Sequence, residues 1–279
     1  MREGKPLLIL ATIITMIAFA ANSLLCRMAL KETSIDAASF TTLRLLAGAA
    51  MLWLLMRAQR QAPLQHGSWR SALALFLYAV TLSYAYRTIN TGAGALMLFG
   101  AVQATMLIAG FLAGERLRGW QTVGFVAAVS GLLVLVLPGV EAPALGDALL
   151  MLASGVAWGV YSLWGRGQPH PAAATAGNFL RAVPFTLLLS LLALPWMNLD
   201  MRGITYAVLS GAVTSALGYV LWYRVLQHMR AMTASTVQLS APVLAALGGI
   251  AFLGEALTRD LLIASVLIIG GIWLVLQRR

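Results

Sequence analysis

Aromatic residues at helical spacing are the side chains in this sequence best suited to bind a small molecule. Trp158 and Tyr161 stand three residues apart, which places their rings near one face of a helix. Each ring combines a broad apolar surface with one polar group that needs a hydrogen-bond partner when it is buried. We predict that these two rings and Tyr78 line a substrate site. The competing interpretation, that Trp158 and Tyr78 are ordinary packing residues, stays open at this point.

Uncharged polar residues inside apolar stretches extend this candidate site. Such side chains either hydrogen-bond a neighbouring helix or line a polar cavity, and both interpretations stay open here. The full set of predicted substrate-binding residues is Phe19, Asn22, Tyr78, Phe99, Gln103, Trp158, Tyr161, Ser215 and Gln238.

Catalytic and cofactor chemistry finds no support in the sequence. There is no phosphate-binding glycine loop, nucleophile elbow or zinc-binding helix. The three histidines, His66, His170 and His228, have no cysteine or acidic cluster near them at the spacing of metal ligands. We therefore predict that the protein is not an enzyme and uses no metal or other cofactor.

The composition indicates that a membrane protein positions these residues. Of the 279 residues, 60% are hydrophobic and 10% are charged, whereas a soluble domain is about 45–50% apolar and about 25% charged. This excludes an ordinary soluble enzyme and a disordered chain, and the single cysteine, Cys26, excludes an internal disulfide. The net charge of +10 comes from basic residues spread between apolar runs, which is typical of membrane-protein loops and not of a nucleic-acid surface.

Ten apolar stretches are candidates for membrane-spanning helices. Helices satisfy their own backbone polar groups within lipid, and these continuous runs lack the alternation of a membrane β-barrel. The predicted spans are Leu7–Leu30, Ala37–Met56, Ser71–Tyr86, Thr91–Ala113, Trp120–Leu137, Leu145–Trp164, Ala172–Trp196, Ile204–Leu226, Ala231–Leu253 and Leu261–Leu276.

Loop charges predict that both termini face the cytoplasm. In this orientation twelve Lys and Arg residues fall on the cytoplasmic side and five on the other, and the predicted outer loop Pro138–Gly146 has none. A cleaved signal peptide with its site at Ala18-Phe19-Ala20 is the alternative interpretation of the first span. It is disfavoured because the apolar run continues past that site.

The two halves of the sequence resemble each other. Gly114-Glu115-Arg116-Leu117 recurs as Gly254-Glu255-Ala256-Leu257, and Ser23–Arg27 matches Ser162–Arg166. We therefore predict two repeats of five helices, residues 1–139 and 140–279. Because five is odd, the second repeat enters the membrane from the opposite side. The predicted fold is an all-α polytopic membrane protein with ten transmembrane helices, arranged as two inverted five-helix repeats around a central cavity, which is typical of transporters.

Ten spans, two five-helix repeats and a Gly-Glu-x-Leu element after the fourth and ninth spans resemble the EamA branch of the drug/metabolite transporter superfamily. The resemblance covers essentially the whole chain. It implies a cavity lined mainly by spans one, three, four, six, eight and nine, with spans five and ten at the back. Within this branch, the aromatic residues of spans three and six are similar to those of the YddG-type aromatic amino acid exporters.

This resemblance implies a carrier in the inner membrane that exports amino acids, aromatic ones included, and related metabolites by alternating access. Its partners are then the small-molecule substrate and the lipid bilayer, with no nucleic acid and no obligate protein partner. A multidrug or cationic-metabolite exporter is the alternative, because aromatic rings also attract cations. A membrane structural or sensory protein is the alternative from another class.

The acidic residues bear on how such a carrier is driven. All nine fall in loops or at the edges of apolar stretches. Proton-coupled carriers usually keep a carboxylate deep in the membrane, where desolvation tunes its pKa. The distribution therefore favours facilitated diffusion or exchange, while proton antiport stays open.

Two arginines stand inside predicted spans at matching repeat positions, Arg44 in the second span and Arg181 in the seventh. A guanidinium can bind a substrate carboxylate through two parallel hydrogen bonds. A structural or snorkelling role is the favoured interpretation, because the resemblance does not assign these two spans a large part of the cavity wall.

Overall fold

The computed structural model describes residues 5–112, 119–136, 143–165, 168–227, 237–238 and 240–276. Within these ranges all regular secondary structure is helical, which confirms the predicted all-α class for this part of the chain. His228, Glu115 and most of the predicted outer loop 138–146 lie outside the described residues.

The described helices follow the predicted spans to within a few residues, except that the first part of the predicted span Ala231–Leu253 lies outside the described residues and α11 begins at Ser240. A short 3-10 turn, η1 (Pro63–Gln65), precedes α3 (Trp69–Ala85), and another, η2 (Leu194–Trp196), follows α7 (Pro171–Ala193). A π-helical stretch, η3 (Leu209–Leu217), joins α8 (Met201–Val208) to α9 (Gly218–Gln227) without a break. The helices are α1 (Lys5–Glu32), α2 (Ala37–Ala58), α3 (Trp69–Ala85), α4 (Thr91–Leu112), α5 (Trp120–Val136), α6 (Leu145–Gly165), α7 (Pro171–Ala193), α8 (Met201–Val208), α9 (Gly218–Gln227), α11 (Ser240–Leu253) and α12 (Arg259–Leu276).

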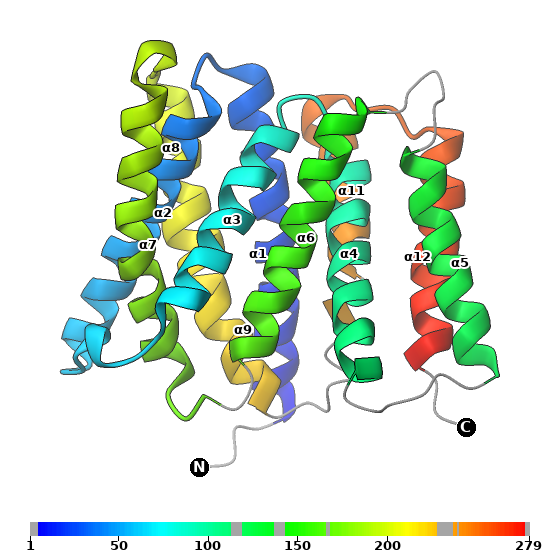
Figure 1. Ribbon diagram of the computed structural model, residues 1–279, viewed down its shortest axis with the longest axis horizontal. Coiled ribbons are helices and arrows are strands. Elements are labelled where there is room, and N and C mark those ends of the chain that lie inside the picture. Colours follow the sequence, from blue (N-terminus) through cyan, green and yellow to red (C-terminus); the bar gives the residue numbers. More distant parts are fainter. Residues whose placement is uncertain are drawn as a thin grey trace.

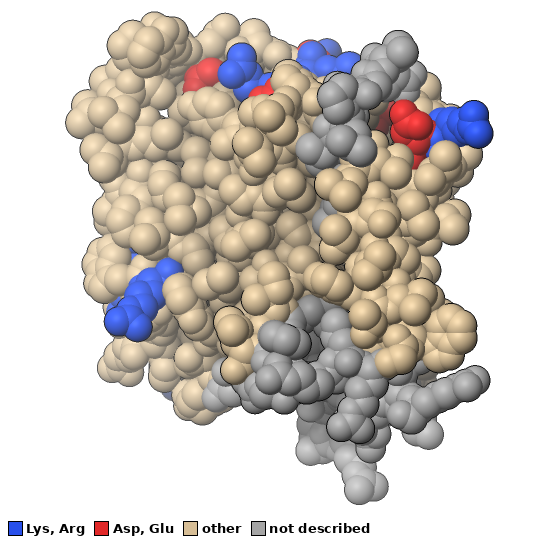
Figure 2. Space-filling model, turned by 45° about the vertical axis from the view of Figure 1, so that its right-hand side comes forward, with Lys and Arg blue, Asp and Glu red and all other residues tan. Residues whose placement is uncertain are grey.

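Length and hydropathy make six helical segments of the described chain suitable for crossing a bilayer. They are Pro6–Glu32, Ala37–Ala58, Thr91–Gly110, Leu145–Gly165, Pro171–Trp196 and Met201–Val225. Large apolar side chains point outward from these segments, such as Leu54 and Leu191, which are 57% and 62% exposed. On the face that Figure 2 shows, charged residues gather toward the ends and leave a broad uncharged band between them. This surface suits lipid contact; the count of ten spans stays a prediction.

The helices stand side by side in one bundle (Figure 1). Helix α1 packs on α11, α9 and η3, while α6 packs on α3 and α4, and α2 packs on α7 and η3. Helices α5 and α12 pair with each other at one side. The start of α1 and the end of α12 lie at the same end of the bundle (Figure 1); we call the opposite end the far end.

Carboxylates begin two of the helices at the far end. Asp36 accepts a hydrogen bond from the backbone N–H of Ser39 at 2.9 Å, and Asp200 accepts one from Gly203 at 2.9 Å. Partial burial raises the pKa of Asp36, but hydrogen bonds from Ser39 and Asn198 outweigh it, so the pKa lies below its ordinary value. Both side chains therefore cap their helices as carboxylates at neutral pH.

Two glycines allow the close approaches on which the centre of the bundle depends. A methyl group at Gly155 of α6 would collide with the carbonyl oxygen of Leu98 in α4. A methyl group at Gly211 of η3 would likewise collide with the carbonyl oxygen of Arg44 in α2. Without side chains at these positions, α4 and α6 come into contact, and so do α2 and η3.

Candidate functional site

A small pocket lies at the centre of the bundle, where α1, α3, α4, α6 and α9 meet. Its volume is about 20 Å³, which is enough for roughly one water molecule. The lining residues are Phe19, Asn22, Ser23, Tyr78, Leu98, Phe99, Trp158 and Tyr219. This volume is far below that of a typical ligand pocket, so a larger ligand requires the helices to separate.

Trp158 is the centre of the aromatic wall. Its ring centroid lies 4.6 Å from that of Tyr219, 4.9 Å from Tyr78 and 5.5 Å from the stacked ring of Tyr161. Phe19 meets it edge-on at 6.2 Å. The wall offers several ring faces from different helices to one ligand.

The Tyr78 hydroxyl forms the polar side of the pocket. Its oxygen accepts hydrogen bonds from Asn22 Nδ2 at 3.2 Å, from Arg44 Nη2 at 3.2 Å and from the Tyr219 hydroxyl at 3.4 Å. These donors come from α1, α2 and α9. The hydroxyl therefore links three helices at the point where they approach the cavity.

Asn22 connects the pocket to the π-helical stretch. Its Oδ1 accepts hydrogen bonds from Ser210 at 2.8 Å, from Thr214 at 3.1 Å and from Ser215 at 3.4 Å. All three hydroxyl residues belong to η3. π-Helical turns occur often at functional sites, and this one directs three hydroxyl groups at one amide.

Arg44 lies directly behind Tyr78 and is 1% exposed. Its guanidinium carbon is 5.2 Å from the centroid of the Tyr78 ring, and Nη2 also donates to Ser215 at 3.4 Å. Nη1 is 3.6 Å from the sulfur of Cys26, and Nε has no hydrogen-bond partner. Within the described residues the ion pair that forms is Arg27 with Glu255, so Arg44 has no carboxylate partner there.

Arg44 and Arg181 have different surroundings in the structure, although the sequence places them at matching repeat positions. The snorkelling interpretation is wrong for Arg44, because hydroxyl groups of neighbouring helices draw its side chain inward. Arg181 donates to the carbonyl oxygens of His66 at 2.6 Å and Leu64 at 2.9 Å. It therefore has the predicted structural role and holds the segment between α2 and α3.

Five of the predicted site residues line the pocket: Phe19, Asn22, Tyr78, Phe99 and Trp158. Ser215 lies in the adjoining polar cluster. Tyr161 stacks on Trp158, but its hydroxyl accepts from Asn178 at 3.4 Å, away from the lining residues. Gln103 and Gln238 are buried and are not among the residues that line this pocket.

Sequence reasoning missed Tyr219, Ser210 and Thr214 and undervalued Arg44. The sequence feature that could have indicated this polar cluster was Arg44, because an ionisable residue inside a membrane span indicates a functional site by default. The other three stand in an apolar run without distinctive spacing. Their convergence depends on the turn geometry of η3.

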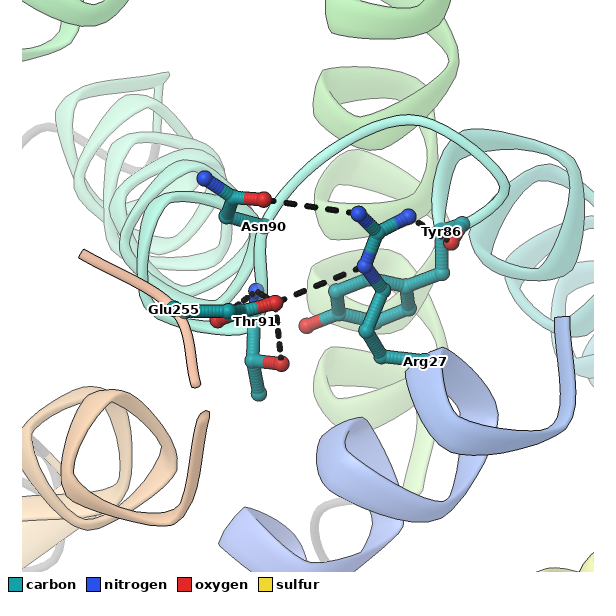
Figure 3. A network of polar contacts seen from close by, with 5 residues as sticks. All are labelled: Arg27, Tyr86, Asn90, Thr91 and Glu255. Carbon is teal, nitrogen blue, oxygen red and sulfur yellow. Dashed lines mark hydrogen bonds and ion pairs between the residues drawn. The ribbon is translucent and has the colours of Figure 1, made fainter. Parts of the chain in front are cut away.

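A second polar network lies at the far end of the bundle (Figure 3). The Glu255 carboxylate accepts from the backbone N–H of Thr91 at 2.8 Å and from its hydroxyl at 3.1 Å, and so holds the start of α4. Arg27 Nε lies 3.4 Å from the same carboxylate. Its other nitrogens donate to the Tyr86 carbonyl at 2.8 Å and to Asn90 at 3.4 Å. We call these five residues the far-end network.

An all-helical membrane bundle around a central pocket is an architecture that small-molecule transporters use. The profile of the EamA-like transporter family matches residues 6–137 and again residues 146–277. The chain belongs to the EamA-like transporter family.

Known relatives agree with this assignment. An uncharacterized protein of Pseudomonas aeruginosa is 54% identical over 97% of this chain and 95% of its own. A probable amino-acid metabolite efflux pump of Escherichia coli is 27% identical over 71% of this chain and 74% of its own. The threonine/homoserine exporter RhtA of Salmonella typhimurium is 35% identical over 45% of this chain and 43% of its own. One solved crystal structure shares the fold, with a TM-score of 0.67 at 23% identity over 94% of this chain and 96% of that chain.

Proposed function

We propose that this transporter exports amino acids, aromatic ones included, and related metabolites across the inner membrane by alternating access. The observation that carries the proposal is the central pocket, where aromatic rings form one wall and hydroxyl and amide groups form the other. Such a site accepts an apolar side chain of varied size together with a polar head group. The Escherichia coli relative, a probable amino-acid metabolite efflux pump, and the Salmonella typhimurium threonine/homoserine exporter support the same substrate class.

Alternating access follows from two halves that exchange roles. Residues 1–139 and 140–279 are the proposed repeats, and the family profile matches once within each. Packing supports this division: α6 contacts α3 and α4, while α1, its counterpart, contacts α8 to α9 and α11. If the halves are inverted, rocking of one against the other opens the pocket to each side in turn.

The far end faces outward in the proposed orientation. The start of α1 and the end of α12 lie at the other end of the bundle, which agrees with both termini on one side of the membrane (Figure 1). Basic loop residues favour that side as the cytoplasm. The far-end network would then hold α1, α4 and the segment after α11 together on the outer side.

The cationic-metabolite alternative is disfavoured by the charge beside the pocket. Aromatic rings attract cations, but the guanidinium of Arg44 lies behind Tyr78 with no carboxylate partner among the described residues. A cation in the pocket would be repelled by this charge. Zwitterionic or anionic substrates fit better.

Transport by purified protein in liposomes tests the proposal. Labelled aromatic and aliphatic amino acids, threonine and cationic drugs would be offered, with and without a pH gradient. Amino acids should cross faster than in empty liposomes. Transport of the cationic drugs alone would support the alternative, and no transport of any compound would contradict the carrier function.

Trp158→Ala should reduce amino-acid transport by about tenfold or change substrate preference, because it removes the centre of the aromatic wall. Trp158→Phe should be milder, since it keeps a ring. Trp273→Ala is the matched control, because Trp273 is 50% exposed on α12. If folded Trp158→Ala transports the whole panel like the control, Trp158 is a packing residue.

A further inference from the structure

Arg44 is a buried cation whose partners are all uncharged. Its nitrogens contact two hydroxyl groups and a thiol, its guanidinium lies over a ring, and Nε has no acceptor. A buried ion without a counter-charge is strongly destabilising. Nothing in the described part of the chain supplies that counter-charge.

The position of Arg44 indicates where a counter-charge would come from. Tyr78 and Asn22 line the pocket, and both belong to the hydrogen-bonded cluster around the guanidinium. One side chain therefore separates the charge from the cavity. Tyr78 and Ser215 carry hydroxyl groups that accept hydrogen bonds from the guanidinium here and can equally donate them.

We propose that Arg44 binds the carboxylate of the transported substrate, which makes it the residue that selects acids over amides and amines. The inference rests on the proposed function. When the helices separate around a substrate, the carboxylate oxygens replace the hydroxyl groups of Tyr78 and Ser215 as acceptors for the guanidinium. Those hydroxyl groups then turn and donate to the carboxylate, while the substrate side chain lies on Trp158 and Phe19.

This arrangement predicts selectivity that the aromatic wall alone cannot give. A ring wall distinguishes side chains only weakly, and it treats phenylalanine, its amide and phenylethylamine alike. A guanidinium favours the negatively charged group strongly and repels an amine that lacks one. The protein should therefore discriminate at the carboxylate and remain permissive at the side chain.

The first test uses the wild-type protein in liposomes loaded with unlabelled phenylalanine, with labelled phenylalanine outside. Phenylalanine, phenylalaninamide and phenylethylamine are compared as competitors of exchange. The amide and the amine should be weaker by at least about tenfold. Equal potency of acid and amide would overturn the role of Arg44 and leave amino-acid transport intact. No exchange of any amino acid would contradict the proposed function itself.

The second test uses Arg44→Gln and Arg44→Lys, with Arg181→Gln as the matched control from the equivalent repeat position. Arg44→Gln should bring the acid-over-amide preference close to one, and Arg44→Lys should restore part of it. Arg181→Gln should keep the full preference even where stability falls, because Arg181 contacts backbone carbonyls. A folded Arg44→Gln protein that keeps the preference would overturn the proposal. If Arg44→Gln does not fold, Arg44→Lys and the wild-type comparison decide.

Discussion

At the scale of single residues, the hydroxyl of Tyr78 has the most connections in the pocket. It accepts from Asn22, Arg44 and Tyr219, which belong to three different helices. A buried donor that loses its acceptor costs more than the hydrogen bond itself contributes, because it was desolvated on folding. One oxygen atom therefore contributes three of the hydrogen bonds that hold the cluster together.

Tyr78→Phe should lower stability by about 1–3 kcal/mol, because Arg44 and Asn22 each lose a buried acceptor. Thermal unfolding in detergent measures the change. Tyr206→Phe on α8 is the control, since the hydroxyl of Tyr206 takes no part in the pocket cluster. A Tyr78→Phe protein as stable as the control would mean that the cluster contributes little to folding.

Some residues of the pocket and its polar cluster could be predicted from the sequence, and others could not for a physical reason. Trp158, Tyr78 and Phe19 are aromatic residues that the sequence analysis assigned to the site, and they line the pocket. The sequence placed Arg44 within a predicted span, but the direction in which its side chain points depends on which face of α2 meets η3. No local pattern encodes that contact, because it arises from Gly211 and from the wider turn of a π-helical stretch far away in the sequence.

At the scale of helices, close backbone contact fixes the shape of the pocket. Gly155 brings α6 against α4, so that Trp158, one turn further along, reaches the cavity lined by Leu98 and Phe99. Helix contacts of this kind are common in membranes, where small residues allow backbones to approach. The position of the aromatic wall therefore depends on a residue with no side chain.

Gly155→Leu should destabilise the protein by about 1–3 kcal/mol or more and reduce transport, because any side chain collides with the Leu98 carbonyl. Gly270→Leu on α12 is the matched control, since a Cβ atom there meets nothing within 4 Å. Yield of folded protein and thermal unfolding would be compared. Equal behaviour of the two variants would contradict the close contact between α4 and α6.

The far-end network joins helices from both halves. Glu255→Gln should weaken it, because the variant removes the charge that pairs with Arg27 and that favours the N-terminus of α4. Cys26, which is buried and is the one cysteine in the sequence, should then react faster with a thiol reagent.

The rate of Cys26 modification in purified protein measures this opening. Asp147→Asn is the control, because Asp147 accepts an exposed hydrogen bond from Thr88 at the same end of the bundle. An unchanged rate in Glu255→Gln would show that the network does not restrict access to Cys26.

At the scale of the whole molecule, the helical fold could be predicted well because apolar run length determines it. The described helices begin and end close to the predicted spans. The pairing of α5 with α12, apart from the pocket, also agrees with the expectation for spans five and ten. The orientation in the membrane is predicted from loop charge, because contacts within the bundle are the same in either orientation.

Single cysteines in a Cys26→Ser background test that orientation. Ala144→Cys, at the far end, should react with an impermeant thiol reagent added outside intact cells. Gln65→Cys, between α2 and α3, should react only after the membrane is opened. The reverse pattern would invert the proposed topology and the assignment of the far end to the outer side.

The size of the pocket has a consequence for the energy of the cell. A bacterial inner membrane stores work as an electrochemical gradient, and any carrier that leaves an open water path dissipates it. Here the centre of the bundle has room for about one water molecule (about 20 Å³), and the Arg44 charge beside it opposes the passage of protons and metal cations. We therefore expect this form of the protein to pass few protons or metal cations across the membrane that it occupies.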